Sequence, residues 1–490
     1  MAQPPNKNLA YIHGEMVRSY MNPKEQSYLA FLKDVSPEGH GETYLKIIED
    51  PEQPVYVTKP PLRLNTVKKE LEDKKNLDMY RTKVSQIPET LWNAVNNPGR
   101  WRNPPFVQPK KMLSNPYIYG ADIDYGVILK EAYNRANGGR KPLDYNVGFL
   151  DIETDVNGSE QIILITFMNG DGRTFVGILK EFFLDHTVDE VYKMWEKKVE
   201  PSFRSKLSKK GLEAYTKSGG IKIECKILPN EAELIRWTFS NIHACRPDFV
   251  GVWNIDFDVP YILQRCEFRQ LDPKQIFCSP EVPYKYRICK YKPDPGKKDG
   301  HLVDRWPWLH LTAFERWIDM MMLYGRLRKA KPREPSYKLD AIGGKEIGAG
   351  KLEFGNGESH STMQRFHQVE YTVYNIVDVL IMYVMEKKNN DVRNMMMLIG
   401  VSTLDCFAHQ SIQLKNHFYQ YLDKLGCVPA SIGERIDDPW DYLIHNKGGA
   451  VLSPDNATIA VHVLIEDMVA IRGSRYVCDI DVSSTIPATR

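Results

Sequence analysis

Residues 147–153 read VGFLDIE, an apolar run that ends in two acids one position apart. Two similar runs follow: IILITFM at 162–168 and DFVGVW at 248–253. Near-continuous apolar runs of this length are typical of central strands covered on both faces. Helical patterns alternate with these runs. The segment is therefore predicted to be an α/β domain with a mixed sheet, its helices lying at 231–246, 260–270 and 368–388.

The length of the whole chain, 490 residues, predicts about three domains. Changes in sequence character divide them at 1–145, 146–395 and 396–490. The 42% hydrophobic and 26% charged residues are typical of a folded globular protein and exclude a largely disordered or coiled-coil chain. Net charge is only +2, so any nucleic-acid contact must come from local basic patches.

Eight cysteines are scattered through the chain without a CxxC pair. This pattern predicts a reduced intracellular protein without structural zinc. The first residues lack the apolar core of a secretory leader, and no run of 18 apolar residues occurs. We therefore expect a cytoplasmic protein that does not contact a membrane.

The first 145 residues offer no catalytic constellation. Strand-like runs at 44–48 and 55–58, a charged stretch at 66–83 that suggests a helix, and a proline-rich crossing at 96–111 predict an α+β domain. Near the other end of the chain, a long helical stretch is expected from 390 to about 425.

The acids of the opening motif, Asp151 and Glu153, would project from one face of a strand because side chains alternate along it. Acid-x-acid pairs arise by chance about 8 times in a chain with 63 acids among 490 residues, so spacing alone is weak support. Their place at the end of an apolar strand is more telling. Two carboxylates there need a metal or another cation.

Two further motifs hold acids near apolar segments. Asp258 lies just before Pro260, where a helix-capping aspartate is the favoured interpretation if the motif is taken alone. Tyr374 and Asp378 are four residues apart and would share one helix face. An ordinary surface pair is the simpler interpretation of the third motif, but the flanking residues are mostly apolar and indicate burial of Asp378.

Hydrolysis of a phosphodiester would explain these residues together. Two divalent ions about 3.5 to 4 Å apart can activate water and stabilise both the reacting phosphorus centre and the leaving oxygen. Mg²⁺ or Mn²⁺ prefers oxygen ligands, which Asp151, Glu153, Asp258 and Asp378 would supply. A neutral Tyr374 hydroxyl could orient the attacking water.

Taken in order, the three motifs resemble those of the tyrosine-type DEDD proofreading exonucleases, most closely the ones inside family B DNA polymerases. The segment PSYKLDAIGGKEIGAGKLEF (335–354) also resembles viral members of that family. The resemblance implies an RNase H-like exonuclease core in which the four acids bind metal and Tyr374 positions water. It further implies that Asn254 and Phe257 contact a single-stranded 3′ end.

Two basic runs accompany these motifs, at 284–300, with hairpin character, and at 326–333. Such runs are usually solvated surface. Beside a nuclease site they become candidate phosphate contacts, and from the second run we select Arg326, Arg328 and Lys329 for DNA binding.

The end of the chain, DIDVSSTIPATR (479–490), resembles the first polymerase motif of the same family, DxxSLYPS. Aligned on the proline, Asp481 corresponds to a metal-binding aspartate, Ser484 to the serine, and Ile486 replaces an aromatic residue that excludes ribonucleotides. Residues 446–449 resemble the YxGG element that links the two activities. The remaining polymerase motifs, KxxxNSxYG and DTD, do not occur, so Asp481 lacks the second aspartate that two-metal nucleotidyl transfer requires.

These features predict the N-terminal part of a split viral family B polymerase: an N-terminal α+β domain, an RNase H-like 3′–5′ exonuclease domain and an incomplete palm. Expected partners are primer-template DNA, a second polypeptide that supplies the missing motifs, and deoxynucleotides only when that polypeptide is bound. A sliding clamp is a further candidate partner, and a bacterial host is expected. The alternatives are a stand-alone exonuclease or polymerase fragment with a structural palm remnant, and a noncatalytic DNA-binding assembly module. The complete acidic set disfavours the last.

Overall fold

The computed structural model describes residues 8–18, 26–37, 41–63, 69–96, 112–139, 142–294, 296, 301–351 and 359–432. They belong to two compact units, each made of several chain segments. The first unit takes its residues from 1–53, 81–86 and 123–425, and the second from 54–80, 87–122 and 426–490.

A six-stranded sheet with the order β11-β10-β9-β8-β12-β15 is the centre of the first unit. Strand β9 runs antiparallel to both of its neighbours, whereas β10–β11, β8–β12 and β12–β15 are parallel pairs. The predicted α/β fold with a mixed sheet is confirmed and is consistent with an RNase H-like domain. The strands are β8 (Val147–Thr154), β9 (Ile162–Met168), β10 (Arg173–Leu179), β11 (Lys222–Leu228), β12 (Phe249–Val252) and β15 (Arg316–Asp319).

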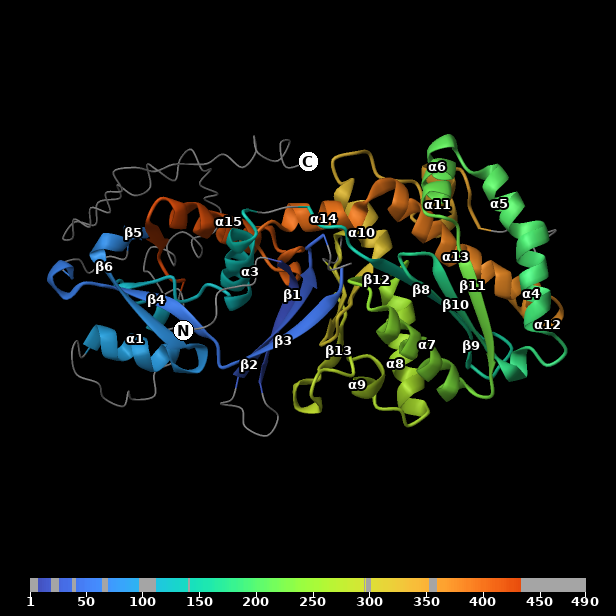
Figure 1. Ribbon diagram of the computed structural model, residues 1–490, viewed down its shortest axis with the longest axis horizontal. Coiled ribbons are helices and arrows are strands. Elements are labelled where there is room, and N and C mark those ends of the chain that lie inside the picture. Colours follow the sequence, from blue (N-terminus) through green and yellow to red (C-terminus); the bar gives the residue numbers. More distant parts are fainter. Residues whose placement is uncertain are drawn as a thin grey trace, which may run out of the picture. The chain divides into compact units, whose positions relative to one another are not determined.

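Helices cover both faces of this sheet because the central strands are apolar on both sides. Phe149 of β8 meets Tyr383 of α13 (Gln368–Asn389) with ring centroids 6.3 Å apart. The opposite face packs on α7 (Glu231–Cys245), where Trp237 lies against Phe175 of β10. In Figure 1, α13 runs above the sheet and α7 below it.

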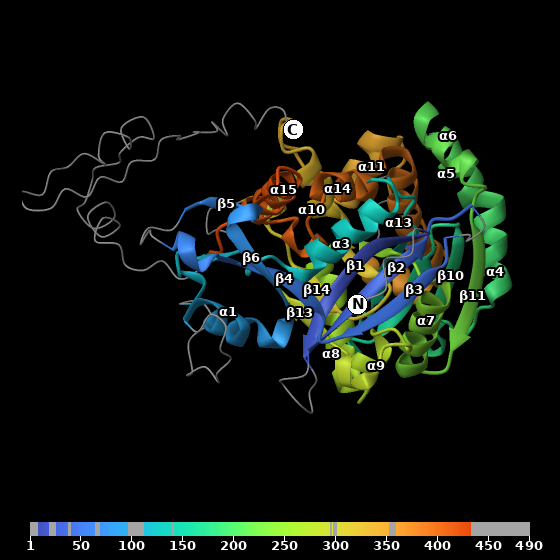
Figure 2. The ribbon, with the colours of Figure 1, turned by 60° about the vertical axis from the view of Figure 1, so that its left-hand side comes forward.

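Shorter helices complete the first unit, and in Figure 2 α4, α5 and α6 lie along the side of the sheet that ends in β11. The expected helix from 390 to 425 is wrong as one element, because Gly400, at φ 66°, ends α14 well before α15 begins. These helices are α4 (Val188–Met194), α5 (Glu200–Lys206), α6 (Lys209–Lys217), α8 (Ile255–Phe268), α9 (Pro273–Ile276), α10 (Met320–Leu327), α11 (Leu339–Ile347), α12 (His360–Phe366), α14 (Asp391–Ile399) and α15 (Gln410–Lys424), with a π-helix at Trp195–Val199.

A second sheet in this unit has the order β1-β2-β3 and packs against α3 (Tyr125–Ala136). Gly14 is required in its first strand because a Cβ there would lie 2.5 Å from the Tyr28 ring. In a separate antiparallel pair, β13 lies within the 284–300 segment for which hairpin character was expected, but its partner β14 lies beyond that segment. The bounds are β1 (Leu9–Arg18), β2 (Gln26–Asp34), β3 (Thr43–Glu49), β13 (Cys289–Lys292) and β14 (Trp308–Leu311).

The second unit contains most of the three-stranded sheet β6-β4-β7, the pair β5–β16 and helix α1. The helix expected at 66–83 is wrong. A 3₁₀ turn at Lys74–Asn76, capped by Asp73 through the backbone N–H of Lys75, separates two strands instead. The elements are β4 (Glu52–Thr58), β5 (Leu71–Asp73), β6 (Leu77–Lys83), α1 (Ile87–Asn96), β7 (Ile118–Tyr119) and β16 (Cys427–Pro429). None of the helices in the described ranges could span a bilayer.

Candidate active site

Two of the expected acids lie on the central strand β8. Asp151 and Glu153 project from the same face as Phe149, since side chains alternate along a strand, and that face packs on α13. The strand is placed between β9 and β12, so its backbone is held by hydrogen bonds on both sides. The fold therefore fixes both carboxylates against one helix.

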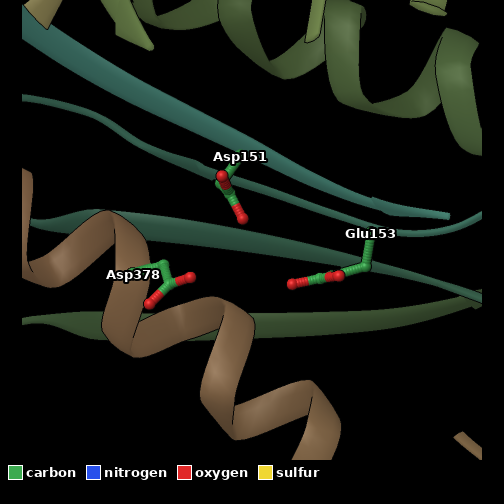
Figure 3. Close-up of side chains that lie close together, drawn as sticks. All are labelled: Asp151, Glu153 and Asp378. Atoms are coloured by element: carbon green, nitrogen blue, oxygen red, sulfur yellow. The ribbon is translucent and has the colours of Figure 1, made fainter. Parts of the chain in front are cut away.

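Helix α13 supplies the third acid to the same place. One carboxylate oxygen from each of Asp151, Glu153 and Asp378 lies within 4.8 Å of the others. Figure 3 shows the three side chains pointing toward one another from the strand and the helix. Asp378 is only 2% exposed, so its charge is largely removed from water.

Two neighbours on α13 hold the strand carboxylates. Asn375 donates to Asp151 Oδ2 at 2.6 Å, and the Tyr371 hydroxyl donates to Glu153 Oε2 at 2.5 Å. With Tyr374 and Asp378 they occupy positions i, i+3, i+4 and i+7 of one helix face. Sequence reasoning missed both residues, although this helical spacing could have revealed them.

Lys351 is the cation nearest the cluster in the described residues, and sequence reasoning missed it as well. Its ammonium donates to the Tyr374 hydroxyl at 2.7 Å and forms a short ion pair with Asp378. Burial lowers the pKa of Lys351, but Asp378, Tyr374 and Asp151 together outweigh this effect and raise the pKa, so the amine stays protonated. Lys351 lies 23 residues before Tyr374, and this spacing matches no helical or strand pattern that would have predicted the contact.

Asp258 lies in the first turn of α8 and is 4% exposed. The helix expected to start at Pro260 begins five residues earlier, and the capping position belongs to Asn254 rather than Asp258. Asp319 explains the early start because its Oδ2 accepts the N–H of Ile255 at 2.9 Å. Asp258 is not one of the three converging acids, but it lies close enough to Glu153 for that charge to act on it.

Burial and mutual repulsion dominate the electrostatics of the cluster. Burial raises the pKa of Glu153 to about 7, against a hydrogen bond from Tyr371 that lowers it. Burial raises the pKa of Asp378 to about 6, although Lys351 opposes the shift. The pKa values of Asp151 and Asp258 are also raised, first by burial and then by neighbouring carboxylates. The protein itself therefore does not neutralise these acids.

The donor set fits a hard divalent cation. Every converging ligand is a carboxylate oxygen, which suits Mg²⁺ or Mn²⁺ rather than a soft metal. Asp378 Oδ1 is also buried and, in the described part of the chain, has no hydrogen-bond partner, a costly state that a bound cation would relieve. The residues present thus match the metal that the sequence suggests, and they do not distinguish between the two ions.

The remaining predicted contacts have different surroundings. Asn254 and Phe257 are exposed on the first turn of α8, beside Asp258, and the Phe257 ring lies 5.6 Å from that of Tyr261. The exposed aromatic ring suits contact with a nucleobase. Their role at a 3′ end stays a prediction.

The selected basic residues of the 326–333 run make contacts within the chain. Arg326 donates to the carbonyl of Asp304 at 2.6 Å, and Lys329 pairs with the Asp304 carboxylate at 2.7 Å. Arg328 donates to both carboxylate oxygens of Asp391, at 2.9 and 3.1 Å. Their role in DNA binding also stays a prediction. Asp481, Ser484 and Ile486, selected for the polymerase site, lie outside the described residues.

Comparison with protein families agrees with this geometry. Residues 143–285 match the family model described as DNA polymerase family B, exonuclease domain. Residues 143–285 are a family B DNA polymerase exonuclease domain. The match spans β8 to α9 and includes Asp151, Glu153 and Asp258. A search of curated proteins found no match.

Membership of this exonuclease family supports a DNA-replication 3′–5′ exonuclease that binds DNA. Exonuclease domains of family B are metal dependent, in agreement with the carboxylate cluster. Tyr374 and Asp378 lie beyond the matched residues, and their assignment rests on the geometry of α13.

Proposed function

We propose that this chain removes nucleotides from the single-stranded 3′ end of DNA during proofreading, using two Mg²⁺ or Mn²⁺ ions. The observation that carries the proposal is the convergence of Asp151, Glu153 and Asp378 within 4.8 Å. Asp258 would complete the ligand set from α8. When bound, the ions supply an activated water and stabilise the leaving 3′ oxygen.

The side chains around the cluster have distinct roles in this proposal. Asn375 and Tyr371 fix the carboxylates of Asp151 and Glu153 through their hydrogen bonds. Burial, followed by the charge of Asp378, raises the pKa of Tyr374, so its hydroxyl stays neutral and can hold a water molecule by hydrogen bonding. Lys351 contacts both that hydroxyl and Asp378, and so holds the two groups in fixed positions relative to each other.

A labelled oligonucleotide tests this function. With Mg²⁺ or Mn²⁺ the protein is expected to shorten a 5′-labelled single strand stepwise, and a 3′-terminal phosphorothioate should block the first step. Replacing Asp151 and Glu153 with alanine should lower the rate by about 10³-fold or more, because ligands of both metals are lost. The matched control is Asp185→Ala with Glu267→Ala, two exposed acids of the same unit. Equal rates for the two double variants would disprove the assignment.

We further propose that the chain supplies the exonuclease part of a polymerase, with the missing polymerase motifs on a second polypeptide. Support comes from the family match and from the resemblance of residues 479–490 to the first polymerase motif. Coexpression with chains that carry the missing motifs should give a complex that extends a primer. Extension that survives Asp481→Ala would contradict the role of Asp481, and the absence of any such complex would contradict the partnership.

A further inference from the structure

The later part of the segment that joins β10 to β11 is basic. Residues 193–222 contain nine lysines and arginines but only three acids, whereas the whole chain has 65 basic and 63 acidic residues. Among these cations, Lys193, Lys197, Lys198, Lys206, Lys209 and Lys210 are all exposed and are called the basic face below. The two basic runs noticed in the sequence do not include them.

The pattern of burial turns these lysines toward solvent. Val191, Trp195, Val199 and Phe203 are buried at intervals of four and form the stripe that packs on the domain. Lys193 and Lys197 lie two positions from members of the stripe and so project from the opposite side of the helix. The basic face is thus the outer surface of α4, the π-helix, α5 and α6.

This face carries charge that the protein does not neutralise. In residues 187–228, all of which are described, Glu200 pairs with Arg204, and no lysine of the basic face makes an ion pair. Lys193 and Lys197 form a like-charge pair at i and i+4, and Lys209 and Lys210 open α6, where the helix dipole disfavours cations. The exposed acids of these helices, Asp189, Glu190, Glu196 and Glu213, form no ion pair with these lysines among the described residues, so positive charge stays in excess on this face.

The basic face belongs to elements that brace the catalytic helix. His186, just before α4, contacts Gln368 at the start of α13 at 3.3 Å. The backbone N–H of Ser208, just before α6, donates at 2.7 Å to the carbonyl of Ile347, close in sequence to Lys351. Both α4 and α6 pack directly on α13, beside which they run in Figure 1.

We propose that the basic face binds the phosphate backbone of the DNA whose 3′ end enters the exonuclease site. The inference rests on the proposed function, because the substrate of that site is a polyanion. Exposed lysines without protein partners suit phosphates, which they attract as point charges without reading the sequence of bases. Arg326, Arg328 and Lys329, by comparison, already contact carboxylates or carbonyls of the chain.

Binding without metal tests the face apart from catalysis. Fluorescence anisotropy in EDTA measures the affinity for a long labelled oligonucleotide from about 50 to 200 mM salt. The variant Lys206→Glu/Lys209→Glu/Lys210→Glu is expected to weaken binding by about tenfold or more, and to reduce the slope of log K against log salt by about 2 to 3. The same titrations are made with single-stranded and with duplex DNA. The form whose affinity falls more in the variant is the form that the basic face binds.

A matched variant controls for net charge. Lys46→Glu/Arg81→Glu/Lys83→Glu makes the same charge change at exposed residues of the same unit. It should leave the salt slope near the wild-type value. Equal effects of the two triple variants on both DNA forms would overturn the proposal, and so would a basic-face variant that binds as tightly as wild type.

Cleavage of a trinucleotide separates this inference from the proposed function. Such a substrate fills the catalytic site but is too short to reach along the surface. The basic-face variant should cleave it at the wild-type rate while showing a higher KM for a long strand. A wild-type protein that cleaves neither substrate would refute the proposed function, whereas the EDTA titrations would still decide whether the face binds DNA.

Discussion

Two groups of fully or partly buried acids in the same domain have opposite electrostatic surroundings. Glu231, fully buried at the start of α7, accepts hydrogen bonds from Arg265 at 2.7 Å to each oxygen and from Arg269 at 2.7 Å. Burial raises its pKa, but the hydrogen bonds from Arg265, Ile162 and Arg269 together outweigh burial, and the net shift is downward. Asp151, Glu153 and Asp378 have a single lysine among them, and their pKa values are raised.

The difference separates a structural acid from acids held for a ligand. Arginines neutralise Glu231 permanently, so that this carboxylate joins α7 to α8 and to β9 through the N–H of Ile162. In the cluster at β8 and α13 the negative charge is compensated only in part, by Lys351, which is costly unless a further cation binds. Glu315 shows a third environment for an acid. It is fully buried and has no hydrogen-bond partner for either oxygen among the described residues.

Removing the charge of Glu231, which is paired with two arginines, should give the largest change in the free energy of unfolding. Glu231→Gln leaves Arg265, only 6% exposed, without its counter-charge. We expect a loss of about 3 to 5 kcal/mol in the free energy of unfolding, measured by chemical denaturation. The control is Glu233→Gln on the same helix, whose exposed pair with Arg236 should contribute at most about 1 kcal/mol. Similar losses in the two variants would show that the arginines do not need Glu231.

At Glu315, unlike at Glu231, loss of the negative charge should stabilise the fold. Burial raises its pKa from 4.5 to about 8, so the folded protein holds it protonated. The stability that this proton provides is complete below about pH 4.5 and is lost as the pH rises toward 8, because the unfolded chain releases the proton first. Burial lowers the pKa of nearby His243, whose Nδ1 lies 3.9 Å from the carboxylate, and so disfavours a compensating positive charge there.

Glu315→Gln should therefore stabilise the protein at pH 8, by up to about 4 kcal/mol, and change little at pH 4.5. The measurement is a pair of denaturation curves at the two pH values. Glu233→Gln, at an exposed acid paired with Arg236, is the control and should show no such pH dependence. A gain of equal size at both pH values would mean that packing rather than ionisation is responsible.

The sequence predicted those parts of the site that depend on one element at a time. Alternation along a strand placed Asp151 and Glu153 on one face, and apolar neighbours correctly indicated that Asp378 is buried. Spacing could not predict Lys351, because its contact with Asp378 depends on how α11 and the turn after it pack on α13. The helix-capping interpretation of Asp258 failed for a similar reason. The start of α8 is fixed by Asp319, 64 residues from Ile255.

Metal binding should provide the smallest effect and the sharpest contrast between the acid groups. A divalent ion that binds only the folded protein adds about 1.4 kcal/mol of stability at ten times its Kd. Wild-type protein should gain this increment with Mg²⁺ or Mn²⁺ in thermal denaturation. Asp151→Asn/Glu153→Gln should lose the gain, while Glu233→Gln should keep it. Since removing two buried like charges also relieves repulsion, the cluster variant is expected to be at least as stable as wild type without metal. A cluster variant that is less stable without metal would show that these carboxylates support the fold, as Glu231 does.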